Sequence, residues 1–250
     1  MAPLRKPLQG VWNIVRFNWH FYALSAAGIV LLLGLRAYLP VVADVLLTLI
    51  LATLVISLGV SCYIYDYSGL YNLSWLGNIP RSGKEQLVNI HAGFDETSVL
   101  LQDKFPQAFL SVFDFYDPLK HTEVSIKRAR KAYPAFPGTQ AVQTDHLPMA
   151  DHSADKVFAL LAAHEVRDEQ ERQVFFKEIN RILQPQGYLV VTEHLRDPAN
   201  FFVYNIGAFH FHSRATWLRT FTAGGFSITQ EIKITPFIHT FILRKHGTTA

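Results

Sequence analysis

The sequence has little cysteine and little charge. Its one cysteine, Cys62, excludes a disulfide within the chain and fits a reducing compartment for the soluble part. Charged residues make up 17% of the 250 positions, and the formal net charge is only +3. Nucleic-acid binding needs a clustered basic surface, which this composition does not provide. We therefore expect no nucleic-acid partner.

Glycine is also scarce where a nucleotide-binding fingerprint would need it. The apolar run 87–90 is followed by a turn in which only Gly93 remains of the three glycines of such a fingerprint. A helix-compatible pattern begins at 97–101 and strand-like residues return at 109–113, so a strand, a turn, a helix and a second strand are predicted. A glycine after a strand lets a ligand approach the backbone, and the following helix points amide N–H groups at it. An ordinary turn with one glycine explains the segment equally well.

Two long hydrophobic runs, 21–39 and 41–65, dominate the amino-terminal quarter. Each is near the roughly 20 residues that an α-helix needs to cross a bilayer core. Pro40 lies between them, where it would end the first helix, and Arg36 and Asp44 can pair beside this turn. No cleavage site separates the runs, which disfavours a secretory signal peptide. The sequence therefore predicts a transmembrane helical hairpin, with a buried hairpin as the alternative.

Positive charges flank this hairpin on both sides, at Arg5, Lys6, Arg16, Arg81 and Lys84. The positive-inside rule then places both flanks in the cytoplasm. The expected location is the inner (cytoplasmic) membrane, with the remaining domain facing the cytoplasm. The predicted organisation is a membrane anchor at 1–66, a connector at 67–85 and an α/β domain at 86–250. We expect the connector to be a lid or docking helix, or simply to pack against the domain.

The rest of the chain alternates between strand-like and helix-like segments. Further strands are expected at 141–142, 156–161, 188–192, 226–234 and 237–244. Helices are expected at 123–132, 169–183 and 216–223, with Pro185 and Gly187 ending the second. This alternation predicts an α/β fold with a doubly wound, mostly parallel sheet of seven strands and an antiparallel hairpin at the carboxyl end. Ligands bind such sheets at the carboxyl edges of the strands, where Gly93, Asp114, Asp145, His164 and Glu193 fall.

Three stretches of this domain carry a family resemblance. Residues 145–157 read Asp-His-Leu-Pro-Met-Ala-Asp-His-Ser-Ala-Asp-Lys-Val, 176–187 read Phe-Lys-Glu-Ile-Asn-Arg-Ile-Leu-Gln-Pro-Gln-Gly, and 224–226 read Gly-Gly-Phe. They resemble the acid, Leu-Pro and Phe-Asp-Val-Val segment, the helix ending in Leu-Lys-Pro-Gly-Gly and the late Ala-Gly-Phe turn of class I S-adenosylmethionine-dependent methyltransferases. The similarity is greatest to the branch that acts on quinones, sterols and small lipids, and it covers about 86–244.

The resemblance implies S-adenosylmethionine as the cofactor. The residues that it implies for cofactor binding are Asn89, His91, Ala92, Gly93, Asp95, Asp114, Phe115, Asp145, His146 and Ala163. The turn departs from the family pattern, because Asn89 stands where the first strand usually ends in an acid, His91 replaces the first glycine and Asp95 the last. An ammonium group thereby loses a counter-charge, which Asp95 or Glu96 could restore. Asp114 and Asp117 both stay open as the acid that binds the ribose.

The chemistry implied by the resemblance is an in-line displacement on a sulfonium. The enzyme mainly aligns donor and acceptor and excludes water, and only an oxygen or carbon acceptor needs help in losing a proton. The catalytic candidates by position are His164, Glu165, Glu193 and His194. Each has a structural alternative: Glu165 or Arg167 can cap the following helix, and His194 can be a hydrogen-bonded residue of the sheet edge.

The segment 201–211 is rich in aromatic residues, and His210 and His212 alternate within Phe209-His-Phe-His-Ser. Without a cysteine or carboxylate at ligand spacing we predict no metal there. Phe209, His210 and His212 are instead expected to line a substrate pocket, with core packing as the rival explanation. Anchoring at a bilayer raises the local concentration of an apolar acceptor. The predicted partners are therefore the membrane and a lipophilic small molecule such as a phenol, quinone, polyene or lipid head group.

The predicted function is a membrane-anchored S-adenosylmethionine-dependent methyltransferase for such an acceptor. The alternative is a catalytically silent, methyltransferase-like protein that binds a nucleoside or acts as a scaffold at the membrane, suggested by the altered turn at 89–95. A nicotinamide-dependent oxidoreductase is disfavoured by the missing glycines and by the late strand pair. The sequence predicts neither the acceptor atom nor the oligomeric state.

Overall fold

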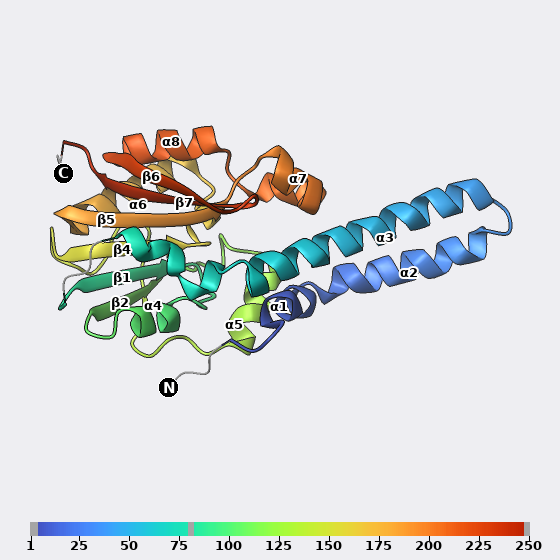
Figure 1. The fold of residues 1–250 in the computed structure, drawn as a ribbon, viewed down its shortest axis with the longest axis horizontal. Helices are drawn as coiled ribbons and strands as arrows, with labels where there is room; N and C mark the ends of the chain where they lie inside the picture. Colours follow the sequence, from blue (N-terminus) through green and yellow to red (C-terminus); the bar gives the residue numbers. More distant parts are fainter. Residues whose placement is uncertain (1–4, 80–82, 248–250) are drawn as a thin grey trace. The chain divides into compact units, whose positions relative to one another are not determined.

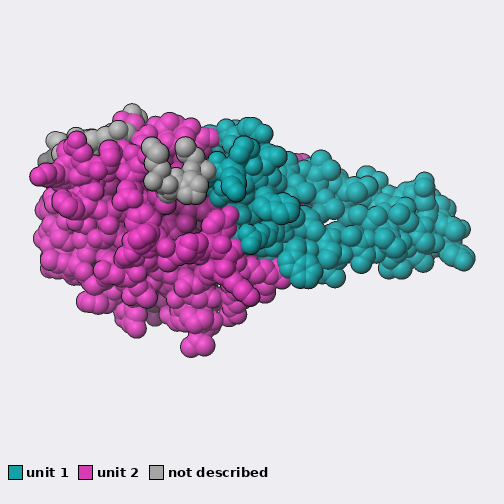
Figure 2. All heavy atoms as spheres, turned by 90° about the horizontal axis from the view of Figure 1, so that it is seen from below, with its two compact units in different colours: residues 1–68 teal, residues 69–250 magenta. Residues whose placement is uncertain are grey.

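The computed structural model of the chain describes residues 5–79 and 83–247. The chain divides into two compact units, Met1–Ser68 and Gly69–Ala250 (Figure 2). Of the positive charges expected to flank the apolar runs, Arg81 lies outside the described residues.

The first unit is helical. It contains α1 (Gln9–Phe17), α2 (Trp19–Leu35) and α3 (Pro40–Cys62), which continues as a π-helical turn, η1 (Tyr63–Tyr67). The prediction that Pro40 ends the first helix is wrong: it is the first residue of α3, a position where the missing N–H of proline costs no hydrogen bond.

Charge pairs within this unit follow the helix ends. The guanidinium Nε of Arg36 lies 2.8 Å from a carboxylate oxygen of Asp44, which confirms the predicted pairing beside the turn between α2 and α3. The carboxylate of Asp66 accepts hydrogen bonds from the backbone N–H groups of Gly10 and Val11 at 2.7 and 2.9 Å. Because the first N–H groups of α1 lack partners within the helix, Asp66 caps α1 from η1.

The apolar side chains of α2 and α3 face outward. No residue of α2 is buried, and only Ala43 and Ser61 of α3 are. Among the described residues one helical stretch, Pro40–Gly77, is long and apolar enough to cross a membrane, and a second would be formed if the bent pair α1 and α2, at 73° to each other, made one span. Only 6% of the most apolar 18-residue window in Pro40–Gly77 is buried, which does not support a hairpin buried in a soluble core.

The second unit is built around one seven-stranded sheet (Figure 1). The strands are β1 (Gln86–His91), β2 (Phe109–Asp114), β3 (Gln140–Ala141), β4 (Ala154–Leu160), β5 (Leu183–His194), β6 (Phe226–Thr235) and β7 (Ile238–Lys245). Their order is β3-β2-β1-β4-β5-β7-β6; the first five are parallel, and β7 runs antiparallel to both neighbours. The predicted mostly parallel sheet with an antiparallel end is confirmed.

Helices cover both faces of the sheet. They are α4 (Ser98–Lys104), α5 (Val124–Ala132), α6 (Glu169–Ile182), α7 (Pro198–Tyr204) and α8 (Arg214–Ala223). Side chains of a strand alternate between faces, so neighbouring residues enter different cores. Val157 belongs to the core that includes Phe175 of α6, whereas Phe158 belongs to the core that includes Leu101 of α4. The doubly wound arrangement follows from this alternation.

The expected connector forms two 3-10 turns, η2 (Leu70–Asn72) and η3 (Ser74–Asn78). Leu73 and Leu76 are almost completely buried in the core on the α4 face. This is the simple packing that the sequence left open, rather than a lid.

The start of β5 differs from the prediction. The strand begins at Leu183, directly after α6, so Pro185 and Gly187 lie inside it rather than between helix and strand. The register with β4 shifts between Ala154 and Lys156, and a proline without an N–H is tolerated at such an irregularity. A Cβ at Gly187 would lie 2.9 Å from the carbonyl oxygen of Asp155, so the close approach of the strands requires glycine.

The order of the strands places a binding crevice at the carboxyl ends of β1 and β4. From β1 the chain continues outward to β2 and β3, whereas β4 returns to the other side of β1. Crevices form where the strand order reverses in this way. In the register of β1 and β2, His91 lies opposite Asp114, so both residues reach this edge.

Candidate active site

The turn after β1 is fastened to α4 by its own side chains. One carboxylate oxygen of Asp95 accepts hydrogen bonds from the backbone N–H groups of Thr97 and Ser98, both at 2.9 Å. The side-chain amide of Asn89 donates to the hydroxyls of the same two residues at 2.9 and 2.8 Å. These backbone N–H groups are therefore not available to a ligand, contrary to the expectation from the sequence. The residues that replace acid and glycine in the family pattern instead close the turn.

Three buried polar atoms in this turn have no hydrogen-bond partner among the described residues. They are Asn89 Oδ1, His91 Nε2 and Asp95 Oδ2. His91 Nδ1 accepts a hydrogen bond from the N–H of Gly93 at 3.1 Å, which places the imidazole proton on Nε2, and burial lowers the pKa of His91. His91 Nε2 and Asp95 Oδ2 lie 3.9 Å from each other, beyond hydrogen-bond length. Buried polar groups are nearly always hydrogen-bonded, so this strand end suits a polar ligand. The two oxygens suit an ammonium group.

Asp114 and Arg130 form an ion pair beside this turn. Asp114 Oδ1 accepts a hydrogen bond from the N–H of Tyr116 at 2.9 Å, and Oδ2 accepts one from Arg130 Nη1. The guanidinium also lies 4.3 Å from the centre of the Tyr116 ring. At Gly93, where φ is +91°, an added Cβ would come within 2.9 Å of both Arg130 and Tyr116. Arg130 and Tyr116 therefore cover Gly93 as well as the acid.

The two acids considered for a ribose, Asp114 and Asp117, both accept hydrogen bonds from nearby groups, and Asp117 also lines the cavity at the carboxyl ends of β2 and β3. Asp114 ends β2 opposite His91, at the strand edge. Asp117 lies in the following loop, where its carboxylate accepts a hydrogen bond from the N–H of Leu119 at 2.8 Å. The loop thus uses the carboxylate of Asp117 to stabilise its own turn.

A cavity of about 600 Å³ opens next to these residues, at the carboxyl ends of β2 and β3. Its walls include Phe115, Tyr116, Thr144 and Asp145. Of the residues expected to bind the cofactor, Phe115 and Asp145 line this cavity, whereas His146 lines a smaller neighbouring one. Ala92 and Ala163 are buried in the hydrophobic core at this edge.

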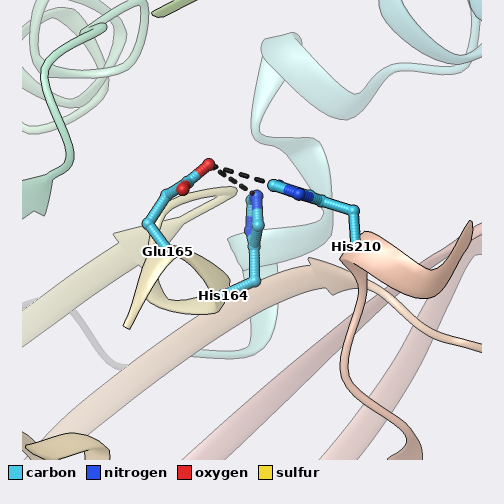
Figure 3. A group of neighbouring side chains, drawn as sticks. All are labelled: His164, Glu165 and His210. Carbon is cyan, nitrogen blue, oxygen red and sulfur yellow. Dashed lines mark ion pairs between the residues drawn. The ribbon is translucent and has the colours of Figure 1, made fainter. Parts of the chain in front are cut away.

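Polar residues also gather at the carboxyl ends of β4 and β5. His164 and Glu165 lie in η4 (Ala163–Glu165) after β4, Glu193 lies near the end of β5, and His210 ends η5 (Asn205–His210). Glu193 Oε2 lies 2.6 Å from His164 Nδ1, and its Oε1 accepts a hydrogen bond from the backbone N–H of His164 at 3.1 Å. Figure 3 shows both imidazoles pointing at the carboxylate of Glu165. Three catalytic candidates and one substrate candidate therefore form one cluster.

The cluster is tightly coupled electrostatically. Burial alone would lower the pKa of His164, but the charge of Glu193 and hydrogen bonds with Glu165 and Glu193 outweigh it and raise the pKa to about 10. Burial likewise opposes the ionisation of Glu165, yet hydrogen bonds from His164 and His210 hold its pKa well below the usual range. The electrostatics of the cluster therefore favour a protonated His164 beside an ionised Glu165.

Glu123 and Arg167 complete this cluster. Glu123 Oε1 lies 2.7 Å from His210 Nδ1, which lowers the pKa of Glu123. Arg167 donates a hydrogen bond to the carbonyl oxygen of His210 and lies against its ring, with Nη2 3.8 Å from carboxylate oxygens of both Glu123 and Glu165. Neither Glu165 nor Arg167 caps α6; Asp168 does, by accepting a hydrogen bond from the N–H of Glu171 at 2.8 Å.

Two histidine candidates lie outside the cluster. His194 Nδ1 hydrogen-bonds the side-chain carbonyl of Asn200 at 2.9 Å, and its ring stacks on Phe211. Burial lowers the pKa of His194 to about 4, so it is neutral and matches the structural alternative. His212 Nε2 lies 3.3 Å from Arg172 Nη1, and burial and Arg172 lower its pKa to about 3. His210 and His212 therefore lie in different surroundings, His210 in the cluster and His212 beside Arg172.

The aromatic segment forms a surface rather than a core. Its α7 and η5 expose Phe201, Phe202, Ile206 and Phe209, while Val203 and Ala208 face inward. Phe209 is 61% exposed and directly precedes His210 of the cluster. Core packing is therefore wrong for these phenylalanines, and exposed apolar side chains border the polar cluster.

Sequence reasoning missed Arg130, Glu123 and Arg167. Arg130 lies in a run of basic residues on a surface helix, and Glu123 only precedes that helix. No spacing or motif separates these residues from ordinary charged surface residues, because their partners come from distant parts of the chain.

The comparisons with known proteins agree on one domain type. Residues 119–191 match the family model described as a methyltransferase domain. No curated protein matches the chain.

Solved structures share the fold at low sequence identity. Geranyl diphosphate C-methyltransferase from Streptomyces coelicolor, in complex with Mg²⁺, geranyl diphosphate and S-adenosyl-L-homocysteine, is 12% identical, with 74% of this chain and 82% of that chain covered and a TM-score of 0.53. A methyltransferase of Haloferax volcanii in complex with the Trm112 activator is 14% identical, with 75% and 93% covered and a TM-score of 0.54. An S-adenosylmethionine-dependent methyltransferase of Aquifex aeolicus is 11% identical, with 72% and 94% covered and a TM-score of 0.50.

Proposed function

We propose that this chain, which its domain match and fold support as an S-adenosylmethionine-dependent methyltransferase with S-adenosylmethionine as cofactor, methylates a lipophilic small molecule at a membrane surface. The observation that carries the proposal is the polar cluster at the ends of β4 and β5, bordered by exposed phenylalanines. The comparisons support the methyl-transfer reaction and the cofactor. The lipophilic nature of the acceptor and the location at a membrane are inferred from this chain's own residues.

The β1 edge has groups that suit the cofactor. The unpartnered oxygens of Asn89 and Asp95 would accept hydrogen bonds from its ammonium group, and Asp114 would accept them from the ribose. The cavity walled by Phe115 and Asp145 suits an adenine. When bound, the cofactor supplies an activated methyl group. The side chains then have to align the acceptor and exclude water.

The β4 and β5 edge has groups that suit the acceptor. It shares the carboxyl edge of the sheet with β1, because β4 pairs with both β1 and β5 in parallel. The polar group of an acceptor would bind to the cluster of His164, Glu165 and His210. Phe201 and Phe209, whose rings are 5.8 Å apart, would hold its apolar part. An acceptor with one polar end and a large apolar body matches this pairing.

The membrane part of the proposal rests on two apolar surfaces. Helices α2 and α3 direct their apolar side chains outward, which water disfavours and lipid does not. In the second unit α7 and η5 expose Phe202 (69%) and Ile206 (81%), as an interfacial helix would. We infer that the first unit is inserted in the inner membrane and that the second unit works on its cytoplasmic side.

The test uses the full chain in phospholipid vesicles with S-adenosylmethionine carrying a labelled methyl group. A phenol or quinol with a polyprenyl or acyl tail should be methylated with a kcat/KM at least about tenfold above that of the same head group without the tail. A Phe201→Ser and Phe209→Ser double variant should raise KM for the tailed acceptor and leave the affinity for the cofactor unchanged. Equal rates for tailed and tailless acceptors would rule out the lipophilic acceptor.

The covered ribose acid favours one alternative, a protein that has kept the fold and lost cofactor binding. Arg130 and Tyr116 cover Gly93, and Arg130 pairs with Asp114. Calorimetric titration of the full chain with S-adenosylmethionine and with S-adenosylhomocysteine separates the two. Binding of either supports the enzyme, and heat from neither would support the scaffold.

A further inference from the structure

The strongest group of potential metal ligands in the described chain is the cluster at the ends of β4 and β5. One donor atom each from His164, Glu165 and His210 lies within 4.8 Å of the others. We propose that these three side chains bind one divalent transition-metal ion of the zinc class. The sequence predicts no metal here, because the ligands lie on separate elements and no carboxylate stands at ligand spacing from His210.

The distances within the cluster match a tetrahedral ion. Glu165 Oε1 lies 3.3 Å from His164 Nε2 and 3.4 Å from His210 Nε2. Zinc bonds to histidine nitrogen and carboxylate oxygen are about 2.0 to 2.2 Å long, and two such ligands at a tetrahedral angle lie about 3.4 Å apart. Figure 3 shows the two imidazoles meeting the carboxylate from different sides. Small shifts of these side chains would leave room for an ion between them.

Both histidines also have the outer partner that a metal-binding imidazole usually has. His164 Nδ1 lies 2.6 Å from Glu193, and His210 Nδ1 lies 2.7 Å from Glu123. A carboxylate on the far nitrogen holds the proton there and directs the lone pair of Nε2 toward the metal. The His164–Glu193 and His210–Glu123 pairs both direct Nε2 of the histidine toward Glu165. A simple ion-pair network at the surface does not require this arrangement.

A divalent cation would take the place of the protons on the imidazoles of His164 and His210, beside the carboxylates of Glu123, Glu165 and Glu193. Arg167 Nη2 lies against Nε2 of His210, the atom that would bind the ion, so its guanidinium would have to turn away; its side chain is 40% exposed and can turn toward solvent.

Two imidazoles and one carboxylate form the ligand set of catalytic zinc sites, in which a further position stays open. Resting on the proposed function, we infer that this position takes a hydroxyl of the acceptor and lowers its pKa. The hydroxyl proton then passes to water, the new C–O bond forms as the C–S bond of the sulfonium breaks, and the sulfur keeps the electron pair. No redox partner is needed.

The test measures metal binding separately from activity. The full chain in detergent is stripped with a chelator and titrated with Zn²⁺ and with Co²⁺, whose absorption reports the coordination. We expect one ion per chain and a tetrahedral Co²⁺ spectrum. Glu165→Gln and His210→Gln should each abolish this spectrum, and the matched control His212→Gln should keep it. Circular dichroism and thermal melting establish that each variant is folded.

A second variant guards against loss of the fold. Glu123 is partly exposed and contacts His210 only from outside the donor set, so Glu123→Gln should fold normally and weaken Zn²⁺ binding about 10- to 100-fold. Arg167→Gln should tighten it, because a competing cation is removed. No stoichiometric ion in the unchanged chain, or equal binding in Glu165→Gln and Glu123→Gln, would overturn the proposal.

The outcomes for the metal and for the methyltransferase can be told apart. Labelled methyl transfer by metal-free protein at the full rate would leave the enzyme standing and remove the metal from its reaction. Ion binding that depends on Glu165 in a protein that does not bind the cofactor would keep the metal site and reject the proposed function.

Discussion

The carboxyl end of β1 and the carboxyl ends of β4 and β5 belong to the same edge of one sheet, but their polar groups are satisfied differently. At β1, Asn89, His91 and Asp95 each keep a buried polar atom that makes no hydrogen bond among the described residues. At β4 and β5, His164 and Glu193 bond to each other. The polar atoms of the first region suit added polar groups, whereas those of the second bond to one another. The comparison indicates that the cofactor binds at the end of β1 and that the acceptor binds at the charged ends of β4 and β5.

The comparison predicts its largest effect on stability at Glu193. Its side chain is fully buried and holds both the ring and the backbone of His164. Glu193→Ala leaves a buried imidazole without its carboxylate, and breaking a buried pair on one side costs about 3–5 kcal/mol. Urea unfolding of the metal-free protein measures this loss.

The matched control for Glu193 is a more exposed pair of the same kind. Glu231 lies 2.9 Å from His239, but its side chain is 21% exposed and also pairs with Arg214. Glu231→Ala should cost about 1 kcal/mol or less. Equal losses at the two sites would show that burial does not distinguish the β5 cluster.

The next effect concerns pH and His194. Burial lowers the pKa of His194 to about 4 in the folded chain, whereas an unfolded chain has a value near 6.5. As pH falls below about 6.5 the unfolded state binds the proton first, so the free energy of unfolding should fall. The loss should reach about 3 kcal/mol near pH 4 and be absent above about pH 7. In the His194→Gln variant, whose side chain can still bond to Asn200, the free energy of unfolding should depend less on pH between about pH 4 and 7. An unchanged dependence on pH would mean that other groups cause it.

On the cofactor side, Asp114→Asn should weaken binding of S-adenosylmethionine about 10- to 100-fold, because hydrogen bonds to a charged acceptor are lost. Asp117→Asn is the control and should leave the affinity within about twofold. Calorimetric titration measures both dissociation constants. A reversed pattern would move the ribose role to Asp117, and thermal melting separates either result from unfolding.

The smallest predicted effect is an increase in the affinity for S-adenosylmethionine. Arg130→Met removes the guanidinium that pairs with Asp114 and covers Gly93. The cofactor then no longer has to displace a partly exposed ion pair, which is worth about 1 kcal/mol at most. The affinity should rise about two- to fivefold by the same titration, and Lys131→Ala, next to it on the exposed end of α5, should change nothing. Weaker binding in Arg130→Met would mean that Arg130 itself contacts the cofactor.

Sequence patterns were most informative where the physical cause is local. The alternation of Val157 and Phe158 between two cores, and the apolar runs of α2 and α3, follow from neighbouring residues alone. The start of β5 was mispredicted because proline and glycine usually end helices. Here a shift in register accommodates Pro185 inside the strand, and this shift depends on β4.

The candidate site was predictable only in part. His164, Glu165 and Glu193 could be identified because each follows or ends a strand at the ligand-binding edge. The separate surroundings of His210 and His212 could not, since adjacent alternating residues look equivalent in a sequence. The exposed phenylalanines of α7 likewise depend on which side of a short helix packs against the sheet.

The amino-acid sequence by itself determined the strand and helix order, the sheet edge that carries the polar residues, and the apolar surface of the first unit. All of these follow from spacing along the chain. Only the tertiary structure decided that Arg130 covers Gly93, 37 residues away, and that Glu165 faces both His164 and His210. Such pairings depend on strand register and on how loops return to the sheet, and local spacing does not encode either.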